Sequence, residues 1–292
     1  MDSIHETSGA VCRFLDESMF AELHRAFIRA FGDYVMPFDL TEEQFRNHII
    51  LNAVDIASSI GAFVDGQLVG FSMNGFGDWD GVPTVYDAGT GVFPEFRRRG
   101  LSEKMFRIML PLFSERGFRQ CLLEVITTNS KAVPLYEKLG LRVTRVLSLI
   151  QAESIQPSEY SNADVELRDI GEPDWNKLRR FWDGRPSWQN STDAIDRSRG
   201  KKCFVAAFIG DICVGYIVFS ERVGRIAQMA VDPAYRRRGI GQKLLESMSE
   251  RMSNEYKPQV INIDRSIESA MEFFSNRGFT ERLSQFEMLR PI

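Results

Sequence analysis

Cysteine and histidine are scarce in this chain, and their positions exclude several kinds of site. The 292 residues contain four cysteines and three histidines. No two cysteines stand at the short spacing of zinc ligands, so we expect no metal site. His5, His24 and His48 all lie early in the chain and pair with no Cys, Asp or Ser motif. A histidine-based catalytic triad is therefore not expected.

An excess of basic residues and long apolar runs are also missing. The formal net charge is −4, which argues against broad binding to nucleic acid or membrane surfaces. No apolar stretch reaches the roughly 18–20 residues of a membrane span. The first residues lack the basic start and apolar core of a secretion signal. We therefore expect a cytoplasmic location.

An internal repeat is the strongest feature that is present. Residues 92–106 read VFPEFRRRGLSEKMF, and residues 231–245 read VDPAYRRRGIGQKLL. Further on, PLYEKLGL at 134–141 matches EFFSNRGF at 272–279. A length near 300 residues favours two domains over one. The repeat therefore predicts two copies of one domain.

The same order of elements is expected in each copy. Apolar runs joined at Asp65-Gly66 and at Gly210-Asp211 are typical of β-hairpins. Each copy reads as helices, a hairpin, a strand, a helix, a strand, a helix and a final strand. This order predicts an α/β (α+β) fold with helices on a mixed, largely antiparallel sheet. We place the domains at 1–150 and 164–292, with a polar linker at 151–163.

A basic loop follows the middle strand of each copy and opens a helix. It reads RRRGLS at 97–102 and RRRGIG at 236–241. Three cations conflict with the positive end of the helix dipole, and a bound anion removes that conflict. Exposed backbone N–H groups beside glycines form such a phosphate site. A solvated basic turn is the simpler alternative, but two loops in matched contexts favour the phosphate site.

The loop and its flanking strand resemble a known family. The pattern Arg-x-x-Gly-x-Gly/Ala after a Val-x-Pro-x-aromatic strand end is similar to the GCN5-related N-acetyltransferases (GNAT superfamily). Arg236, Gly239 and Gly241 fit this pattern fully. In the first copy Ser102 replaces the last small residue, a mild departure. The resemblance covers both halves and implies two tandem GNAT acyl-CoA N-acyltransferase domains.

The resemblance also implies a cosubstrate, acetyl-CoA, and no metal. In that family the coenzyme lies between two splayed parallel strands, and a strand N–H group polarises the thioester carbonyl. The residues that would bind coenzyme in the first copy are Gly91, Val92, Arg97, Arg98, Arg99, Gly100, Leu101 and Ser102. The corresponding set in the second copy is Met229, Ala230, Val231, Arg236, Arg237, Arg238, Gly239, Ile240 and Gly241.

Candidate acid–base residues stand in the first copy. The run of Glu124, Asn129 and Tyr136 resembles the GNAT branch that acetylates protein N-termini. By resemblance, Asn129 would contact coenzyme, Glu124 would act as base and Tyr136 as acid. Glu124 sits among apolar residues, which would make it a better proton acceptor. An ion-pair role for Glu124 and a packing role for Tyr136 stay open, and so does the direction of the nearby Asp87.

The second copy departs from this set. With Gly140 aligned on Gly278, the equivalent residues are Asn262, Ile267 and Phe274. Phe274 has no proton to donate. We therefore predict that the first copy is catalytic.

The predicted function is transfer of an acetyl group from acetyl-CoA to a primary amine by direct attack. The acceptor would be a small-molecule amine or a peptide, and we expect neither nucleic acid nor membrane as a partner. One alternative is an acyl-CoA sensor that regulates a partner. Another is catalysis by the second copy, where Asp264, Ser266 or Tyr235 would move protons. Tyr34, Phe38, Asp78 and Trp79 are candidates for an acceptor pocket in the first copy.

Overall fold

The computed structural model describes residues 9–33, 39–156, 164–253 and 255–292. The chain divides into two compact units. Unit 1 consists of Met1–Thr144 together with Glu287–Ile292, and unit 2 consists of Arg145–Phe286. None of the helices in the described ranges is long and apolar enough to cross a membrane.

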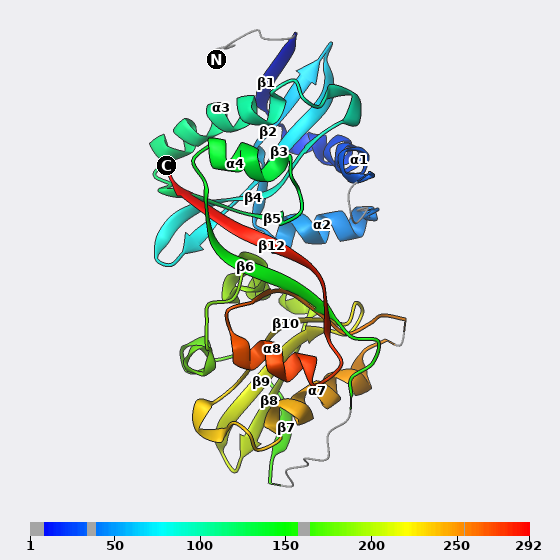
Figure 1. The fold of residues 1–292 in the computed structure, drawn as a ribbon, viewed down its shortest axis with the longest axis vertical. Coiled ribbons are helices and arrows are strands. Elements are labelled where there is room, and N and C mark those ends of the chain that lie inside the picture. Colours follow the sequence, from blue (N-terminus) through cyan, green and yellow to red (C-terminus); the bar gives the residue numbers. More distant parts are fainter. Residues whose placement is uncertain (1–8, 34–38, 157–163, 254) are drawn as a thin grey trace. The chain divides into compact units, whose positions relative to one another are not determined.

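Unit 1 is built on a sheet in the order β1-β2-β3-β4-β5, with the end of β12 beside β5 (Figure 1). Neighbouring strands from β1 to β4 are antiparallel, whereas β4 and β5 are parallel. The elements are β1 (Ala10–Phe14), α1 (Phe20–Phe31), α2 (Glu42–Leu51), β2 (Val54–Val64), β3 (Gln67–Trp79), β4 (Val82–Val92), α3 (Leu101–Glu115), β5 (Gln120–Ile126) and α4 (Ala132–Lys138).

Helices cover both faces of this sheet. Phe71 of β3 lies 6.1 Å from Phe27 of α1 between ring centroids. Phe76 of the same strand lies 5.2 Å from Phe113 of α3. Because side chains alternate along a strand, Phe71 and Phe76 point to opposite faces. Helices α1 and α3 therefore enclose the strands that lead to the candidate site.

Unit 2 repeats this plan in the order β7-β8-β9-β10-β11-β6. Here β10 and β11 are the parallel pair. The elements are β6 (Arg142–Gln151), β7 (Glu166–Asp169), α5 (Trp175–Leu178), α6 (Thr192–Arg197), β8 (Cys203–Ile209), β9 (Ile212–Ser220), β10 (Arg225–Val231), α7 (Ile240–Arg251), β11 (Gln259–Asp264), α8 (Glu268–Ser275) and β12 (Thr280–Pro291). The predicted mixed, largely antiparallel α/β fold is confirmed in both halves.

The closing strand of each unit comes from the other half of the sequence. β6 follows α4 along the chain, yet from Arg145 onward it belongs to unit 2, where it pairs with β11. The last residues of β12 join unit 1, where the Ile292 N–H donates to the Arg119 carbonyl at 2.9 Å. The sequence repeat would leave each final strand in its own copy. The order of elements in the sequence is the same in both copies, so it does not show which of β6 and β12 closes which unit.

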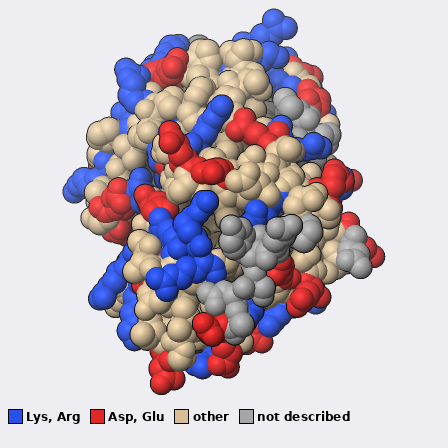
Figure 2. Space-filling view, turned by 60° about the horizontal axis from the view of Figure 1, so that its bottom comes forward, with Lys and Arg blue, Asp and Glu red and all other residues tan. Residues whose placement is uncertain are grey.

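Charged side chains of both signs share the face in Figure 2, with Lys and Arg lying among Asp and Glu. Some opposite charges pair within one helix, such as Arg46 with Glu42 at 2.9 Å and Arg107 with Glu103 at 2.8 Å. Exposed pairs of this kind contribute roughly 0–1 kcal/mol each. They mark solvated helix faces.

Candidate active site

Each unit contains a point where two parallel strands separate. The β4–β5 pairing ends at Asp87 with Leu123, although β4 continues to Val92. The β10–β11 pairing ends at Ile226 with Val260. We call these points the first apex and the second apex. They match the splayed strands that the family resemblance predicts.

A β-bulge follows each apex. On β4, Asp87 faces Asn74 and Gly89 faces Met73, which leaves Ala88 as the extra residue. On β10 the same shift falls between Ile226 and Gln228. Bulges re-aim backbone groups and are common beside active sites. Both units therefore keep the backbone irregularity at the predicted thioester position.

The strand ends carry the next predicted residues. Gly91 pairs with Phe71 in β3, and a side chain on Gly91 would approach Ala30 of α1 to 2.8 Å. This glycine therefore allows α1 to pack closely on β4. In unit 2 the predicted strand residues line a cavity, and they are Met229, Ala230 and Val231.

The basic loops have the same backbone geometry in both units. Arg98 and Arg237 both have φ of 62°, and the N-cap residues Gly100 and Gly239 have φ of 73° and 79°. Glycine adopts this left-handed conformation without steric cost. Within the described residues, no side chain caps α3 or α7 at the N-terminus. The first-turn N–H groups thus fit a phosphate ligand.

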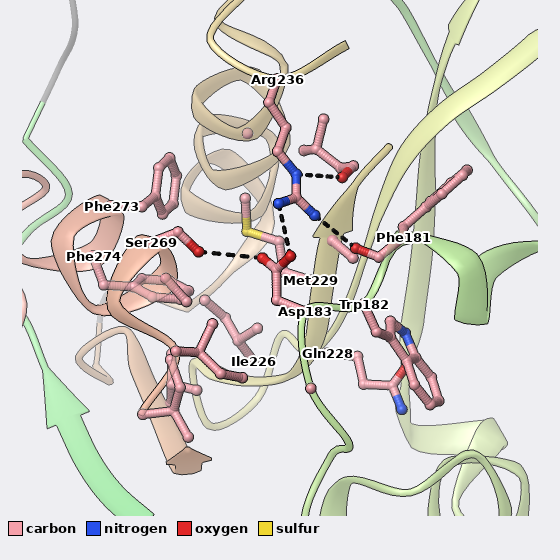
Figure 3. A pocket seen from close by; sticks show the side chains of 18 of the residues that line it. Phe181, Trp182, Asp183, Ile226, Gln228, Met229, Arg236, Ser269, Phe273 and Phe274 are labelled. Atoms are coloured by element: carbon pink, nitrogen blue, oxygen red, sulfur yellow. Dashed lines mark hydrogen bonds and ion pairs between the residues drawn. The ribbon is translucent and has the colours of Figure 1, made fainter. Parts of the chain in front are cut away.

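The first arginine of each loop forms a clamp. The Arg97 and Arg236 Nε groups donate to the main-chain carbonyl five residues earlier, both at 3.0 Å. Arg97 also donates to Asp33 at 2.6 and 2.7 Å, and Arg236 donates to Asp183 at 2.8 Å (Figure 3). The hydrogen bonds from Arg97 hold the pKa of Asp33 below its usual value. These guanidinium groups fix the loop to the segment that follows the first helices.

The third arginine of each loop stacks on the aromatic residue of the strand-end motif. Arg99 lies 4.9 Å from the Phe96 ring centroid, and Arg238 lies 5.2 Å from that of Tyr235. Arg237 lines the unit 2 cavity. The arginines of one loop therefore make different contacts, and their binding to coenzyme stays a prediction.

The aspartates of the two clamps were not among the predicted site residues. A signal for them exists in the sequence, because Phe-x-Asp occurs at 31–33 and again at 181–183. The repeat is too short to stand out until Arg97 and Arg236 are seen to bind its aspartates.

A buried carboxylate lies at the first apex. Asp87 is 6% exposed, and its Oδ1 accepts a hydrogen bond from the Gly89 N–H at 3.0 Å. Thr90 Oγ1 lies 3.0 Å from both carboxylate oxygens. The buried Tyr136 hydroxyl donates to Asp87 Oδ2 at 3.4 Å. Burial raises the pKa of Asp87 to about 6, against the hydrogen bonds, which lower it.

The second carboxylate of this apex lies on the opposite face of the sheet. The hydroxyl of Tyr86, a buried residue, donates to Glu124 Oε2. Tyr86 and Asp87 are consecutive in β4, so their side chains point to opposite faces. The first apex thus has Glu124 on one side and Tyr136 with Asp87 on the other.

Asn129 lies three residues before α4, the helix that carries Tyr136. Its Oδ1 accepts from the N–H groups of Lys131 and Ala132, at 3.3 and 3.0 Å. Asn129 thus holds the turn that leads into α4. Its predicted contact with coenzyme stays a prediction.

The second apex opens into a cavity of about 730 Å³ (Figure 3). Apolar side chains occupy the equivalent polar positions of the first apex. Ile226, Met229 and Phe274 stand where Asp87, Thr90 and Tyr136 stand in unit 1, and all three line the cavity. Gly241 also lines it, and a side chain there would meet Phe273 at 3.1 Å.

Neutral polar groups form a chain at one wall of this cavity. Trp182 Nε1 donates to the Tyr216 hydroxyl at 2.6 Å, and that hydroxyl donates to Gln228 Oε1 at 2.8 Å. Gln228 Nε2 then donates to the Asn190 carbonyl at 2.6 Å. Burial raises the pKa of Tyr216, so its hydroxyl stays protonated. The chain orients its members without supplying a base.

The remaining predicted residues have other local roles. Asp264 lies 3.3 Å from Arg145 and also accepts from the Ser266 hydroxyl at 2.7 Å. Asp78 closes the β3–β4 turn by accepting from the Gly81 N–H at 2.7 Å. Trp79 is buried. The predicted acceptor residues Tyr34 and Phe38 lie outside the described residues.

Comparison with known families and structures agrees with this geometry. A model of the acetyltransferase (GNAT) family matches residues 17–141, and one of the acetyltransferase (GNAT) domain matches 175–288. A solved tandem GNAT protein from the clavulanic acid biosynthesis pathway has the same fold, with a TM-score of 0.71 at 12% identity. That likeness covers 96% of this chain and 98% of the other. The chain therefore belongs to the GNAT superfamily, as a member with two tandem domains.

Two curated proteins are similar over shorter stretches. An N-alpha-acetyltransferase of Sulfurisphaera tokodaii is 32% identical over 95 residues, which are 30% of this chain and 57% of that protein. A putative [ribosomal protein bS18]-alanine N-acetyltransferase of Bacillus subtilis is 32% identical over 78 residues. That match covers 27% of this chain and 49% of the relative. The chain thus spans about half the length of these relatives.

Proposed function

We propose that the protein transfers an acetyl group from acetyl-CoA to a primary amine, and that unit 1 catalyses the reaction. The first apex carries the proposal, because two proton-transferring groups flank the point where β4 and β5 separate. Glu124 lies on one face of the sheet and Tyr136 on the other. The amine attacks the thioester carbonyl from one side and the thiolate leaves on the other, so a base is needed on the first side and an acid on the second.

Each group moves one proton. Glu124 accepts a proton from the ammonium form of the acceptor, and the neutral nitrogen then forms a bond to the thioester carbon. Tyr136 donates its phenolic proton to the sulfur as the carbon–sulfur bond breaks. The attacking nitrogen at that stage carries one proton more than the amide product, and this proton returns to the phenolate, while Glu124 releases its own proton to solvent. A backbone N–H at the bulge stabilises the oxyanion between these steps.

Coenzyme binding would use the backbone of each loop. The left-handed Gly100 and Gly239 leave first-turn N–H groups without a side-chain cap. Acetyl-CoA supplies the activated acyl group, and its pyrophosphate is the anion that suits these N–H groups. Arg98 and Arg237 add charge, while Arg97 and Arg236 keep each loop in place.

Primary amines, including peptide N-termini, are the acceptors that we propose. The two curated relatives are named for N-terminal and alanine N-acetylation, and the Glu124–Tyr136 arrangement agrees with that chemistry. A peptide with a free N-terminal alanine is therefore the first acceptor to test, followed by small primary amines.

The direct test measures release of free thiol from acetyl-CoA with each acceptor of that panel. Turnover with at least one amine, lost in Tyr136→Phe and kept in the exposed control Tyr256→Phe, is the expected result. Coenzyme binding without turnover on any acceptor would reject catalysis.

A second candidate function, acyl-CoA sensing, is favoured by the cavity at the second apex. That cavity combines the coenzyme loop with Asn262 and Phe274, which cannot act as base or acid, at the positions of Glu124 and Tyr136. Of the acidic residues that line it, Asp183 and Asp264 are engaged with Arg236 and Arg145, and Glu272 is exposed on α8. Unit 2 would then bind an acyl-CoA without transferring the acyl group. Catalysis in unit 2 is the competing alternative, and thiol release that survives Glu124→Gln would reveal it.

A further inference from the structure

Asp87 has no part in the proton transfers above, although its buried carboxylate contacts the Tyr136 hydroxyl. It is the last paired residue of β4 before the strands separate. Its carboxylate contacts the bulge through Gly89 and Thr90, and α4 through Tyr136. We propose that Asp87 is a positioning residue, whose carboxylate holds the Tyr136 hydroxyl at the bulge, from where the hydroxyl turns its proton to the leaving thiolate as the carbon–sulfur bond breaks. This inference rests on the proposed function of unit 1.

The bulge alone does not require a carboxylate at this position. Unit 2 forms the same bulge with Ile226 in place of Asp87. An asparagine would accept the same hydrogen bond from the Gly89 N–H and bury no charge. A charge at a buried apex is costly, as the raised pKa of Asp87 records. Costs of this kind concentrate at functional sites.

The contact with Tyr136 explains why a carboxylate is useful. An ionised acceptor forms a stronger hydrogen bond than a neutral one. Tyr136 also packs edge-on against Phe106 of α3, with 5.7 Å between ring centroids. The Tyr136 ring is thus held by packing against α3, and its hydroxyl is held by Asp87. In unit 2, the Phe274 ring is packed in the core but has no hydroxyl for a hydrogen bond.

Other ionisable groups near Asp87 have separate roles. Burial, with a smaller effect of the Asp87 charge, raises the pKa of the Cys121 thiol, so this β5 group stays neutral. His48 of α2 bonds the Ala88 carbonyl at 2.9 Å. Glu124 lies on the opposite face with Tyr86. Asp87 is therefore the carboxylate that acts on the Tyr136 side of the sheet.

The first experiment is a double-mutant cycle in the full-length protein. We measure kcat and KM for acetyl-CoA, with the best acceptor of the amine panel, in Asp87→Asn, Tyr136→Phe and the double variant. We expect Asp87→Asn to lower kcat roughly 10- to 100-fold with little change in KM. Because Asp87 acts through Tyr136, the double variant should be no slower than Tyr136→Phe alone.

The matched control is Asp232→Asn. Asp232 also accepts a hydrogen bond from the N–H two residues on, Ala234, at 2.9 Å, but it lies at the end of β10. It should leave kcat unchanged. If Asp87→Asn keeps the wild-type kcat while Tyr136→Phe is slow, only this inference fails. If Tyr136→Phe also keeps the wild-type kcat, the proposed function fails with it.

A second experiment needs no acceptor. The Tyr136 ¹³Cζ signal, assigned by its loss in Tyr136→Phe, is followed by NMR between pH 4 and pH 8. It should shift with a midpoint near the Asp87 pKa of about 6, and the shift should vanish in Asp87→Asn. A wild-type signal that does not respond to pH, or one that titrates unchanged in Asp87→Asn, would overturn the positioning contact.

Discussion

The two apexes of this chain share a backbone and differ in their chemistry. Both have a parallel strand pair that separates, a bulge after the last pair, a left-handed glycine and an arginine–aspartate clamp. At the first apex, Asp87, Glu124 and Tyr136 surround the opening. At the second apex, Ile226, Asn262 and Phe274 occupy those positions.

The difference shows which parts of a duplicated site change independently. The clamp and the left-handed loop involve several contacts each, so one substitution disturbs the whole loop. The side chains proposed for proton transfer differ at single positions, where Phe274 replaces Tyr136 and Asn262 replaces Glu124. Phe274, for example, keeps the packing role of Tyr136 and is equally buried.

The largest difference between the two apexes is expected when the proposed base of the first apex is removed. We expect Glu124→Gln to lower kcat roughly 100- to 10,000-fold, because the amine then keeps its proton. Thiol release from acetyl-CoA measures this effect, with the exposed Glu115→Gln on α3 as control. An unchanged kcat would move catalysis to unit 2.

The next prediction concerns Asp87→Asn, which should raise the stability of unit 1 although it lowers kcat. The folded-state pKa of Asp87 is raised from 3.8 to about 6. The stability linked to its protonation is therefore complete below pH 3.8 and is lost as the pH rises through about 6. At pH 7, Asp87→Asn should stabilise unit 1 by up to roughly 3 kcal/mol.

Hydrogen exchange in urea measures this change in unit 1 and unit 2 separately. The gain should shrink towards pH 4, where wild-type Asp87 binds its proton. A variant that is less stable at pH 7 would mean that Asp87 serves packing alone.

Removing a clamp should have a smaller effect, similar in both units. Arg97→Ala and Arg236→Ala each lose hydrogen bonds to two main-chain carbonyls and to an aspartate. We expect each to raise the Kd for coenzyme A in its own unit by roughly 3- to 10-fold. Titration calorimetry with coenzyme A measures both sites. Arg97→Lys keeps the charge but lacks the planar fork, so it should recover little.

The smallest effects concern the left-handed glycines. Gly100→Ala and Gly239→Ala should each destabilise their unit by roughly 1 kcal/mol, because alanine is strained at φ of 73° and 79°. Urea unfolding measures this change. The control is Gly171→Ala, where the added side chain would meet open space. Equal losses in both units would sharpen the conclusion that the loops are equivalent.

Much of the fold can be predicted from the sequence because the chain contains two copies of the same domain pattern. The repeated Val-x-Pro-x-aromatic-Arg-Arg-Arg-Gly segment predicts a strand, a loop and a helix, and the structure has them at β4 to α3 and at β10 to α7. The arginines themselves were less predictable. Their identity predicts a phosphate site, but the side chains of Arg97 and Arg99 are engaged by Asp33 and by Phe96. Asp33 is far from Arg97 in the sequence, and no sequence pattern indicates that Phe96 contacts Arg99.

The sequence by itself determined the duplicated α/β fold, the two basic loops, and the replacement of Glu124 and Tyr136 by Asn262 and Phe274 in the second half. These are local patterns, set by periodicity, by turn residues and by side-chain identity. Only the tertiary structure decided that β6 and β12 close each other's units. It also decided that Asp87 faces Tyr136 while Glu124 faces Tyr86. The face that a side chain occupies depends on strand register, and a shift of one residue moves the side chain to the other face of the sheet.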